Sequence, residues 1–264
     1  MVRNAVPPAV VELRNGEGGT ITAGEPIAMA GVQEWRVAVY LLGVDSTTHP
    51  GDYVIVGMNT AGAIAFAQPL EIVERDFRSE EIPLTPSLTS LRDEPDPRKT
   101  EQTRVLTELI LSRDPDAVFH TGPLGWPLPP ETRRTSLYGD RRTFLYADGR
   151  RARAIHVGLD FASPVGTTVV SSGSGVVRMA RDRIVTGKTV VIEHLPGVYS
   201  LYYHLDELAV EEGRTISQGD VVGTVGATGL ATGPHLHWEV RVGGVAVSPE
   251  AATESPLLLV WPVR

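Results

Sequence analysis

The first eighty residues alternate short apolar runs with turn signals, which is the pattern of a small β domain. Segments rich in Gly, Asn and Pro, such as "NGEGG" and "THPGD", separate the runs. We expect strands within residues 9–14, 20–31, 34–44, 52–58 and 63–77. Strands at this regular spacing predict an Ig-like β-sandwich over residues 1–80.

Residues 81–135 have the composition of a linker that contains one helix. The stretch "IPLTPSLTSLRDEPDPRKT" carries four prolines and charges of both signs. After it, apolar residues recur at helical spacing, which predicts a helix over about residues 100–113. The stripe consists of Val105, Leu106, Leu109 and Ile110.

From residue 136 to about residue 250 the pattern returns to strands and glycine turns, and residues 251–264 form a C-terminal tail. The clearest alternation is "TGPHLHWEV", residues 232–240. On a strand, its two histidines and Glu239 share one face, whereas Leu236, Trp238 and Val240 share the other. The apolar face indicates a core, so the histidines face water, a metal or a substrate.

The composition favours a mainly β fold and excludes some kinds of chemistry. The chain has 27 glycines and 20 prolines, which favour short strands and turns over long helices. It has no cysteine, so disulfides, thiolate catalysis and cysteine-ligated metals are excluded. No stretch approaches the roughly 20 apolar residues that a membrane helix needs, so we expect no membrane span in this chain.

The charge is uneven along the chain. Residues 1–135 hold 12 basic and 19 acidic residues, whereas the remainder holds 12 and 13, for a total of −8. Nucleic-acid binding requires a basic surface, so the acidic N-terminal half argues against a nucleic-acid partner.

Histidines and one aspartate form a candidate zinc donor set in the C-terminal half. His156 and Asp160 share a face of a strand, and the residue between them on that face is Gly158, which has no side chain to obstruct a shared ion. Imidazole and carboxylate are both zinc ligands, and His235 and His237 supply further imidazoles. The alternatives are an ordinary ion pair and a half-exposed strand.

Three motifs resemble those of the M23 metallopeptidase family, the LytM/lysostaphin-type peptidoglycan endopeptidases. They are "H-x-G-x-D" at 156–160, "Y-x-H-L" at 202–205 and "G-P-H-L-H-W-E" at 233–239. The resemblance covers roughly residues 136–250. It implies an antiparallel β peptidase domain with an open groove.

The resemblance also implies roles for individual residues. It implies one Zn²⁺ held by His156, Asp160 and His237. His204 and His235 would then be catalytic histidines that exchange protons with the reacting water and the leaving amine. Tyr146 precedes the first ligand and is a candidate transition-state contact. Two further histidines have no motif around them: we expect a structural or surface role for His194 and a loop position for His120, which alternatively caps the groove.

The function implied is zinc-dependent hydrolysis of peptide cross-links in bacterial peptidoglycan, with DD-endopeptidase specificity. The alternative is a non-hydrolytic or autoinhibited regulator that binds or activates a peptidoglycan hydrolase. The N-terminal domain is then a spacer, a module that binds a protein regulator, or a lid. Such a substrate places the protein in the cell envelope, periplasmic or extracellular, and we expect a leader or anchor outside this sequence.

Overall fold

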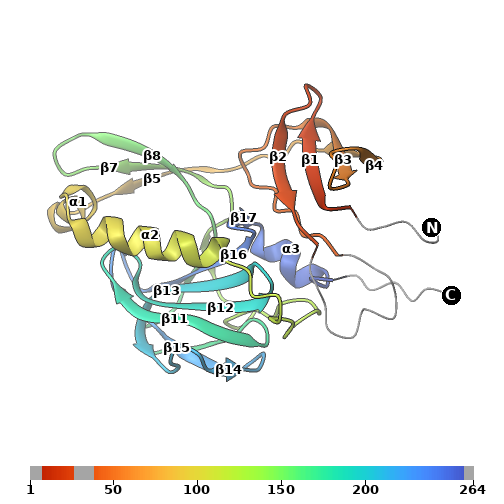
Figure 1. Cartoon of the computed structure of the whole chain (residues 1–264). Helices are drawn as coiled ribbons and strands as arrows, with labels where there is room; N and C mark the ends of the chain where they lie inside the picture. The colour runs from red at the N-terminus through yellow and green to blue at the C-terminus, as the bar shows by residue number, and fades with distance from the viewer. Residues whose placement is uncertain (1–7, 27–38, 259–264) are drawn as a thin grey trace.

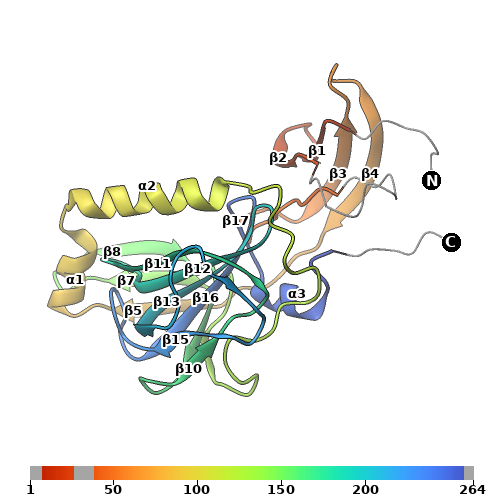
Figure 2. The same ribbon diagram turned by 60° about the horizontal axis from the view of Figure 1, so that its bottom comes forward.

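The computed structural model describes residues 8–26 and 39–258, and these residues form a mainly β protein. A small N-terminal sheet lies to one side of a large antiparallel sheet, and a three-stranded sheet with a short helix lies at the other end (Figures 1 and 2). A longer helix runs along the large sheet. No helix within the described ranges is long and apolar enough to cross a membrane.

The N-terminal domain is one four-stranded antiparallel sheet in the order β2-β1-β3-β4. Its strands are β1 (Val10–Asn15), β2 (Thr20–Gly24), β3 (Gly51–Met58) and β4 (Ile64–Ile72). The second sheet that the predicted Ig-like sandwich requires is not found among the described residues. Almost every residue of β4 is exposed, which agrees with an edge strand that no second sheet covers.

The strand expected at 34–44 does not form where the chain is described. Residues 34–38 lie outside the described ranges, and residues 39–44 contain no strand. Val39 and Leu41 instead pack against Leu195 and Val198 of the large sheet. Their apolar side chains therefore join the two parts of the molecule, which is why this segment does not complete a sandwich.

The segment expected to be a linker contains two helices, not one. Helix α2 (Pro97–Leu111) overlaps in sequence with the helix predicted at about residues 100–113. Its predicted apolar stripe packs on the large sheet near Tyr199. Helix α1 (Pro86–Asp93) was not predicted. Each helix begins with proline in its first turn, a position that tolerates proline because no N–H is needed there. Two of the four prolines interpreted as linker residues, Pro86 and Pro97, therefore start helices.

A parallel strand pair connects this segment to the C-terminal part. Strand β5 (Ser79–Pro83) pairs in parallel with β7 (Arg141–Leu145), and β7 pairs antiparallel with β8 (Arg151–Ile155). The predicted boundary between residues 80 and 81 falls inside β5. Residues far apart in sequence thus form one small three-stranded sheet.

The large sheet has the antiparallel topology that the sequence predicts. Its main path is β14-β11-β12-β13-β16-β9-β6, with β10 and β15 paired to each other, β15 also beside β13, and β17 beside β16. The strands are β6 (Arg134–Ser136), β9 (Leu159–Ala162), β10 (Thr168–Val170), β11 (Gly175–Arg183), β12 (Gly187–Leu195), β13 (Val198–Leu208), β14 (Thr215–Ile216), β15 (Val221–Val225), β16 (His235–Val242) and β17 (Val245–Val247). The short helix α3 (Pro249–Glu254) follows. Leu236, Trp238 and Val240 are fully buried, as the alternation of β16 predicts.

His194 is a buried structural histidine of β12. Its Nδ1 lies 2.8 Å from the carbonyl oxygen of Ser174 and its Nε2 lies 2.8 Å from Ser200 Oγ. The ring of His120 packs edge-on against it, with 6.2 Å between centroids. Burial lowers the pKa of His194 to about 4 from an ordinary value of 6.5.

This buried histidine predicts an acid-dependent loss of stability. Between pH 6.5 and about 4 the unfolded chain binds a proton at this site and the folded chain does not, so stability falls as pH falls through this window. A pKa shift of this size corresponds to a change of about 3 kcal/mol in the free energy of unfolding. We expect urea unfolding at pH 7.5 and pH 4.5 to show a smaller difference for His194→Gln than for the wild type. His49→Gln, which changes an exposed loop histidine, is the control; an equal pH dependence in all three proteins contradicts the prediction.

Candidate metal centre and active site

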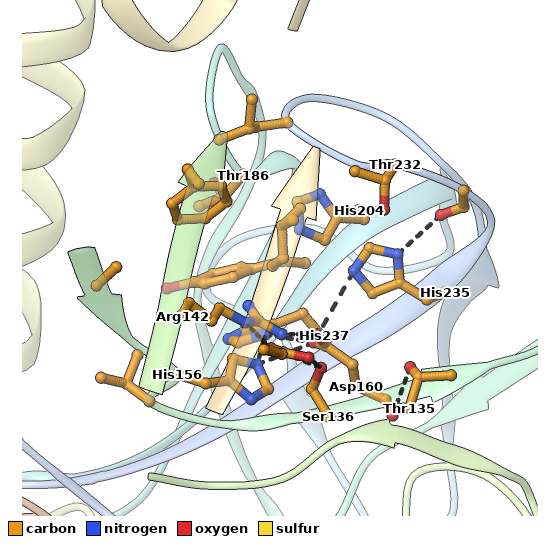
Figure 3. Close-up of a pocket in the computed structure, with 18 of the residues that line it drawn as sticks. Thr135, Ser136, Arg142, His156, Asp160, Thr186, His204, Thr232, His235 and His237 are labelled. Atoms are coloured by element: carbon orange, nitrogen blue, oxygen red, sulfur yellow. Dashed lines mark hydrogen bonds and ion pairs between the residues drawn. The ribbon is translucent and has the colours of Figure 1, made fainter. Parts of the chain in front are cut away.

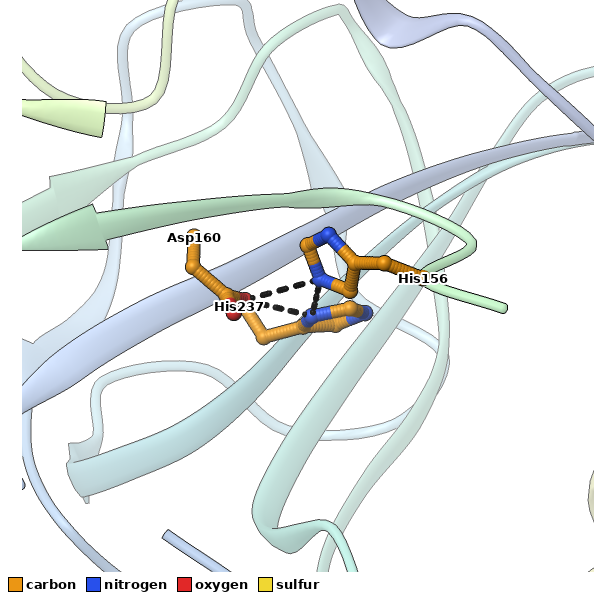
Figure 4. Close-up of side chains that lie close together, drawn as sticks. All are labelled: His156, Asp160 and His237. Carbon is orange, nitrogen blue, oxygen red and sulfur yellow. Dashed lines mark hydrogen bonds and ion pairs between the residues drawn. The ribbon is translucent and has the colours of Figure 1, made fainter. Parts of the chain in front are cut away.

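Three side chains converge where β9 meets β16. Asp160 and His237 are directly paired across the two strands, and His156 precedes β9. His156 Nε2, His237 Nδ1 and Asp160 Oδ1 lie 2.7 to 3.0 Å from one another (Figure 4). All three residues are buried, and together they form a group that could hold a metal ion.

Each ligand histidine uses one ring nitrogen for a hydrogen bond outside the metal group, so that its other ring nitrogen faces the centre. The carbonyl oxygen of Leu137 accepts from His156 Nδ1 at 2.9 Å, so Nε2 is left as the ligand atom. Glu239 Oε1 lies 2.9 Å from His237 Nε2, so Nδ1 is left. Such outer partners are typical of metal-binding histidines. The donor set therefore fits zinc, which binds imidazole and carboxylate.

Gly158 supplies the space that this arrangement needs. A Cβ at this position would lie 2.4 Å from the carbonyl oxygen of Trp238 and 2.9 Å from His237 Nε2. Both contacts are far shorter than a side chain tolerates, so any other residue would displace the ligand strand. The glycine between His156 and Asp160 is thus required by the close approach of β16.

The charge state of the centre follows from its burial. Burial opposes ionisation of Asp160, but its close contacts with His156 and His237 outweigh this effect and hold the pKa of Asp160 well below its ordinary value. Burial likewise opposes protonation of His237, and the hydrogen bonds to Asp160 and Glu239 raise the pKa of His237 to about 9. A metal ion bound at this centre would compete with the proton on His237 Nδ1.

Two charged residues that were not predicted from the sequence, Arg142 and Glu80, form a chain of ion pairs that ends at Asp160. Arg142 Nη2 donates to Asp160 Oδ2, which leaves Oδ1 for a metal. Arg142 Nε donates to Glu80 Oε1 at 2.5 Å, and Glu80 also accepts from Ser136 Oγ at 2.9 Å. No motif surrounds Glu80 in the sequence. Only the parallel pairing of β5 with β7 brings Glu80 to this place.

The two predicted catalytic histidines lie beside the centre. His204 on β13 and His235 on β16 have ring centroids 4.7 Å apart (Figure 3). Carbonyl oxygens of Thr228 and Gly233 lie 2.8 Å from their respective Nδ1 atoms, so each Nδ1 carries the proton and each Nε2 is left as an acceptor. His235 Nε2 lies 3.9 Å from Asp160 Oδ1, at the edge of the metal group.

His204 is held neutral and in an unusual backbone conformation. Burial, with the nearby rings of His235 and His237, lowers its pKa to about 3. Its φ of 61° makes it the one non-glycine residue with positive φ among those the structure describes. This kink interrupts the alternation of β13, so the consecutive residues Tyr203 and His204 both line the pocket.

Tyr203, which the sequence analysis did not assign to the site, packs directly on one of the candidate ligands. Its ring is stacked on the ring of His237, with 5.3 Å between centroids and 7° between planes. A fully regular strand would have turned Tyr203 and His204 to opposite faces. The missed signal is therefore the backbone kink, which the side-chain pattern does not reveal.

A pocket of about 570 Å³ contains the centre and both histidines. Its walls come from β5, α1, β7, the residues around Thr186 and the loop before β16. Tyr146 is not among the described residues that line it; the Tyr146 hydroxyl instead accepts from Arg92 Nε at 3.0 Å. His120 does not line it either and packs against His194. The structure thus brings together five of the six predicted site residues.

The part of the chain that holds the site resembles a known peptidase family. Residues 154–249 match the sequence model of peptidase family M23. A Pseudomonas aeruginosa protein described as an M23 peptidase has the same fold over most of its length, with a TM-score of 0.61 and 22% identity over 95% of this chain and 90% of that one.

Two relatives with named activities match a shorter part of the chain at higher sequence identity. The peptidoglycan DD-endopeptidase ShyA of Vibrio cholerae is 41% identical over 123 residues, which is 47% of this chain and 28% of ShyA. The DD-carboxypeptidase/endopeptidase Mpg of Neisseria meningitidis serogroup B is 43% identical over 95 residues, which is 36% of this chain and 22% of Mpg. The matched region spans about a quarter of the length of these relatives.

The contact between Glu239 and His237 predicts a measurable effect on metal affinity. We expect Glu239→Gln to weaken zinc binding about 10-fold, because the neutral amide is a poorer acceptor for His237 Nε2, and loss of such partners typically costs 10- to 100-fold. Competition with a chromogenic chelator measures this affinity. Glu193→Gln is a matched control, since Glu193 is equally buried and paired with Arg178 but lies away from the metal group. Equal affinities of the two variants contradict the prediction.

Proposed function

We propose that this chain is a zinc-dependent DD-endopeptidase that hydrolyses peptide cross-links of bacterial peptidoglycan. The observation that carries the proposal is the convergence of three buried metal-ligand atoms beside two further imidazoles in one pocket. The names of ShyA and Mpg supply the substrate class and the DD specificity. A substrate of this kind places the protein in the cell envelope.

The residues have distinct roles in the proposed reaction. His156, Asp160 and His237 would hold the zinc ion, which when bound would supply a Lewis acid for the scissile carbonyl and for the attacking water. His204 and His235 present unprotonated Nε2 atoms, so they accept the proton of the attacking water and return a proton to the leaving amine. Arg142 keeps one oxygen of Asp160 turned away from the centre.

The alternative, a regulator without hydrolytic activity, has less support. A non-hydrolytic relative would be free to lose its ligands, whereas this chain retains the three ligands and both further histidines in one pocket. The N-terminal domain acts in our proposal as a spacer or partner-binding module. The segment that follows it, β5 with α1, forms one wall of the pocket.

The test is metal analysis combined with digestion of purified peptidoglycan. We expect about one zinc per chain and conversion of cross-linked muropeptide dimers to monomers with a newly exposed amine, followed by mass spectrometry. Chelation of zinc should stop the reaction and added zinc should restore it. A protein that binds zinc and cleaves no cross-link supports the regulator alternative, and a protein that binds no zinc contradicts both the site and the function.

A further inference from the structure

One wall of the pocket carries an arginine to which the proposed reaction assigns no role. Arg92 lies in the last turn of α1 and lines the pocket that contains the metal centre. Its guanidinium lies over the ring of Phe144, with Cζ 4.0 Å from the ring centroid. Its Nε donates to the Tyr146 hydroxyl at 3.0 Å. These two contacts hold the guanidinium plane in one orientation.

The charge of Arg92 is not matched by any carboxylate among the described residues. The other arginine of the pocket, Arg142, is paired with both Glu80 and Asp160. The acidic neighbour of Arg92 in the helix, Asp93, is paired with Arg150 instead. Arg92 is therefore the one pocket cation without an acidic partner in the part of the chain that the structure describes.

The surroundings of Arg92 strengthen its attraction for an anion. The adjoining wall contains Ile82, Leu84 and Phe144, of which Leu84 and Phe144 are buried. Low polarity around an ionic hydrogen bond increases its strength. With Nε engaged by Tyr146, the terminal nitrogens remain for a planar, two-oxygen group, and a carboxylate has the matching geometry.

We propose that Arg92 forms a carboxylate subsite that binds a free carboxylate of the substrate peptide and so determines specificity. This inference rests on the proposed function, because the peptides of peptidoglycan carry free carboxylates on side chains and at their carboxyl ends. The subsite lies in α1, outside the region that matches the family model. Tyr146 then acts through Arg92 as a positioning residue.

The test compares two synthetic cross-linked peptides, one with free carboxylates and one with the same groups amidated. With zinc-loaded wild type, we expect kcat/KM to be about 10- to 100-fold higher for the free-carboxylate peptide, mainly through KM, as for a hydrogen-bonded ion pair. Arg92→Gln should lose this preference, with unchanged zinc content and unchanged kcat/KM for the amidated peptide. Tyr146→Phe should reduce the preference about 2- to 10-fold.

Arg153→Gln is the matched control, because Arg153 is an exposed arginine on β8 that does not line the pocket; its preference should equal that of the wild type. If Arg92→Gln loses activity equally on both peptides, Arg92 has a structural role and the proposal is overturned. The proposal is also overturned if Arg92→Gln keeps the wild-type preference for the free-carboxylate peptide.

Binding of the two peptides, measured by calorimetry, separates this proposal from the proposed function. If the wild type hydrolyses neither peptide, the proposed function fails, but a preference for the free-carboxylate peptide that Arg92→Gln abolishes still supports the subsite. Equal binding of both peptides by the wild type overturns the subsite even if hydrolysis is observed. A preference that weakens with added salt agrees with an ionic contact.

Discussion

Replacement of His237 by alanine is expected to remove both the metal and the hydrolytic activity. His237 supplies one of three ligand atoms, and its Nδ1 lies 2.7 Å from Asp160 Oδ1. Because loss of a mere hydrogen-bond partner of a ligand costs 10- to 100-fold in affinity, loss of the ligand itself should weaken zinc binding by more than about 100-fold. Metal content after dialysis and peptidoglycan digestion measure the two effects.

The control for His237→Ala is His49→Ala, which removes an exposed loop histidine and should leave zinc content and activity unchanged. Circular dichroism shows whether the variant is folded, since His237 lies in a central strand of the large sheet. A folded His237→Ala protein that retains about one zinc would show that the ligand assignment is wrong.

Replacement of His204 is expected to leave the metal in place and abolish turnover. His204 is outside the three-residue metal group but lies beside His235 in the same pocket. Loss of a general acid–base residue typically costs 10²- to 10⁴-fold, so kcat should fall by about that factor with little change in KM. Zinc content and steady-state kinetics on a cross-linked peptide measure the two quantities.

Two variants are needed at His204, because its φ is 61°. Alanine is strained in this left-handed region, whereas asparagine adopts it more readily. We therefore expect His204→Asn to be the more stable variant and as inactive as His204→Ala. If His204→Asn retains more than a tenth of the wild-type kcat, the imidazole is not needed for proton transfer and His204 serves the backbone conformation instead.

The predicted roles divide the pocket into parts that come from distant regions of the chain. The region that matches family M23, residues 154–249, supplies the candidate metal group and both proposed catalytic histidines. Glu80 and Arg92 come from the segment before it and line the same pocket. The proposed hydrolysis therefore uses residues of the matched region, whereas the proposed recognition of a substrate carboxylate uses Arg92 from the preceding segment.

Local patterns in the sequence were sufficient for several parts of this structure. Side-chain alternation in β16 predicted that Trp238 is buried while His235 and His237 face the pocket, because a strand repeats every two residues whatever its neighbours are. The apolar stripe of α2 likewise predicted a helix. The spacing of His156 and Asp160 indicated a shared ion site, and these two donors do converge with His237, although His156 precedes β9 and does not lie on the strand.

Other parts were decided by contacts between residues distant in sequence. The residues at 39–44 carry a strand-like pattern, yet Val39 and Leu41 pack on the large sheet instead of completing a sandwich. Tyr146 precedes the first ligand in sequence, but the β7–β8 hairpin turns it toward Arg92 and away from the metal group. Glu80 meets Arg142 only because β5 and β7 pair in parallel.

The physical reason for this division is the range of the forces involved. Periodicity acts within a few residues, so the amino-acid order by itself predicted the alternation of strand β16, a helix at the position of α2 and the strand face that carries His235 and His237. Pairing between distant strands is chosen by the total burial and hydrogen bonding of the folded chain, which no local pattern encodes. The tertiary structure alone therefore decided that Glu80, Arg92 and Arg142 share a pocket with the metal group.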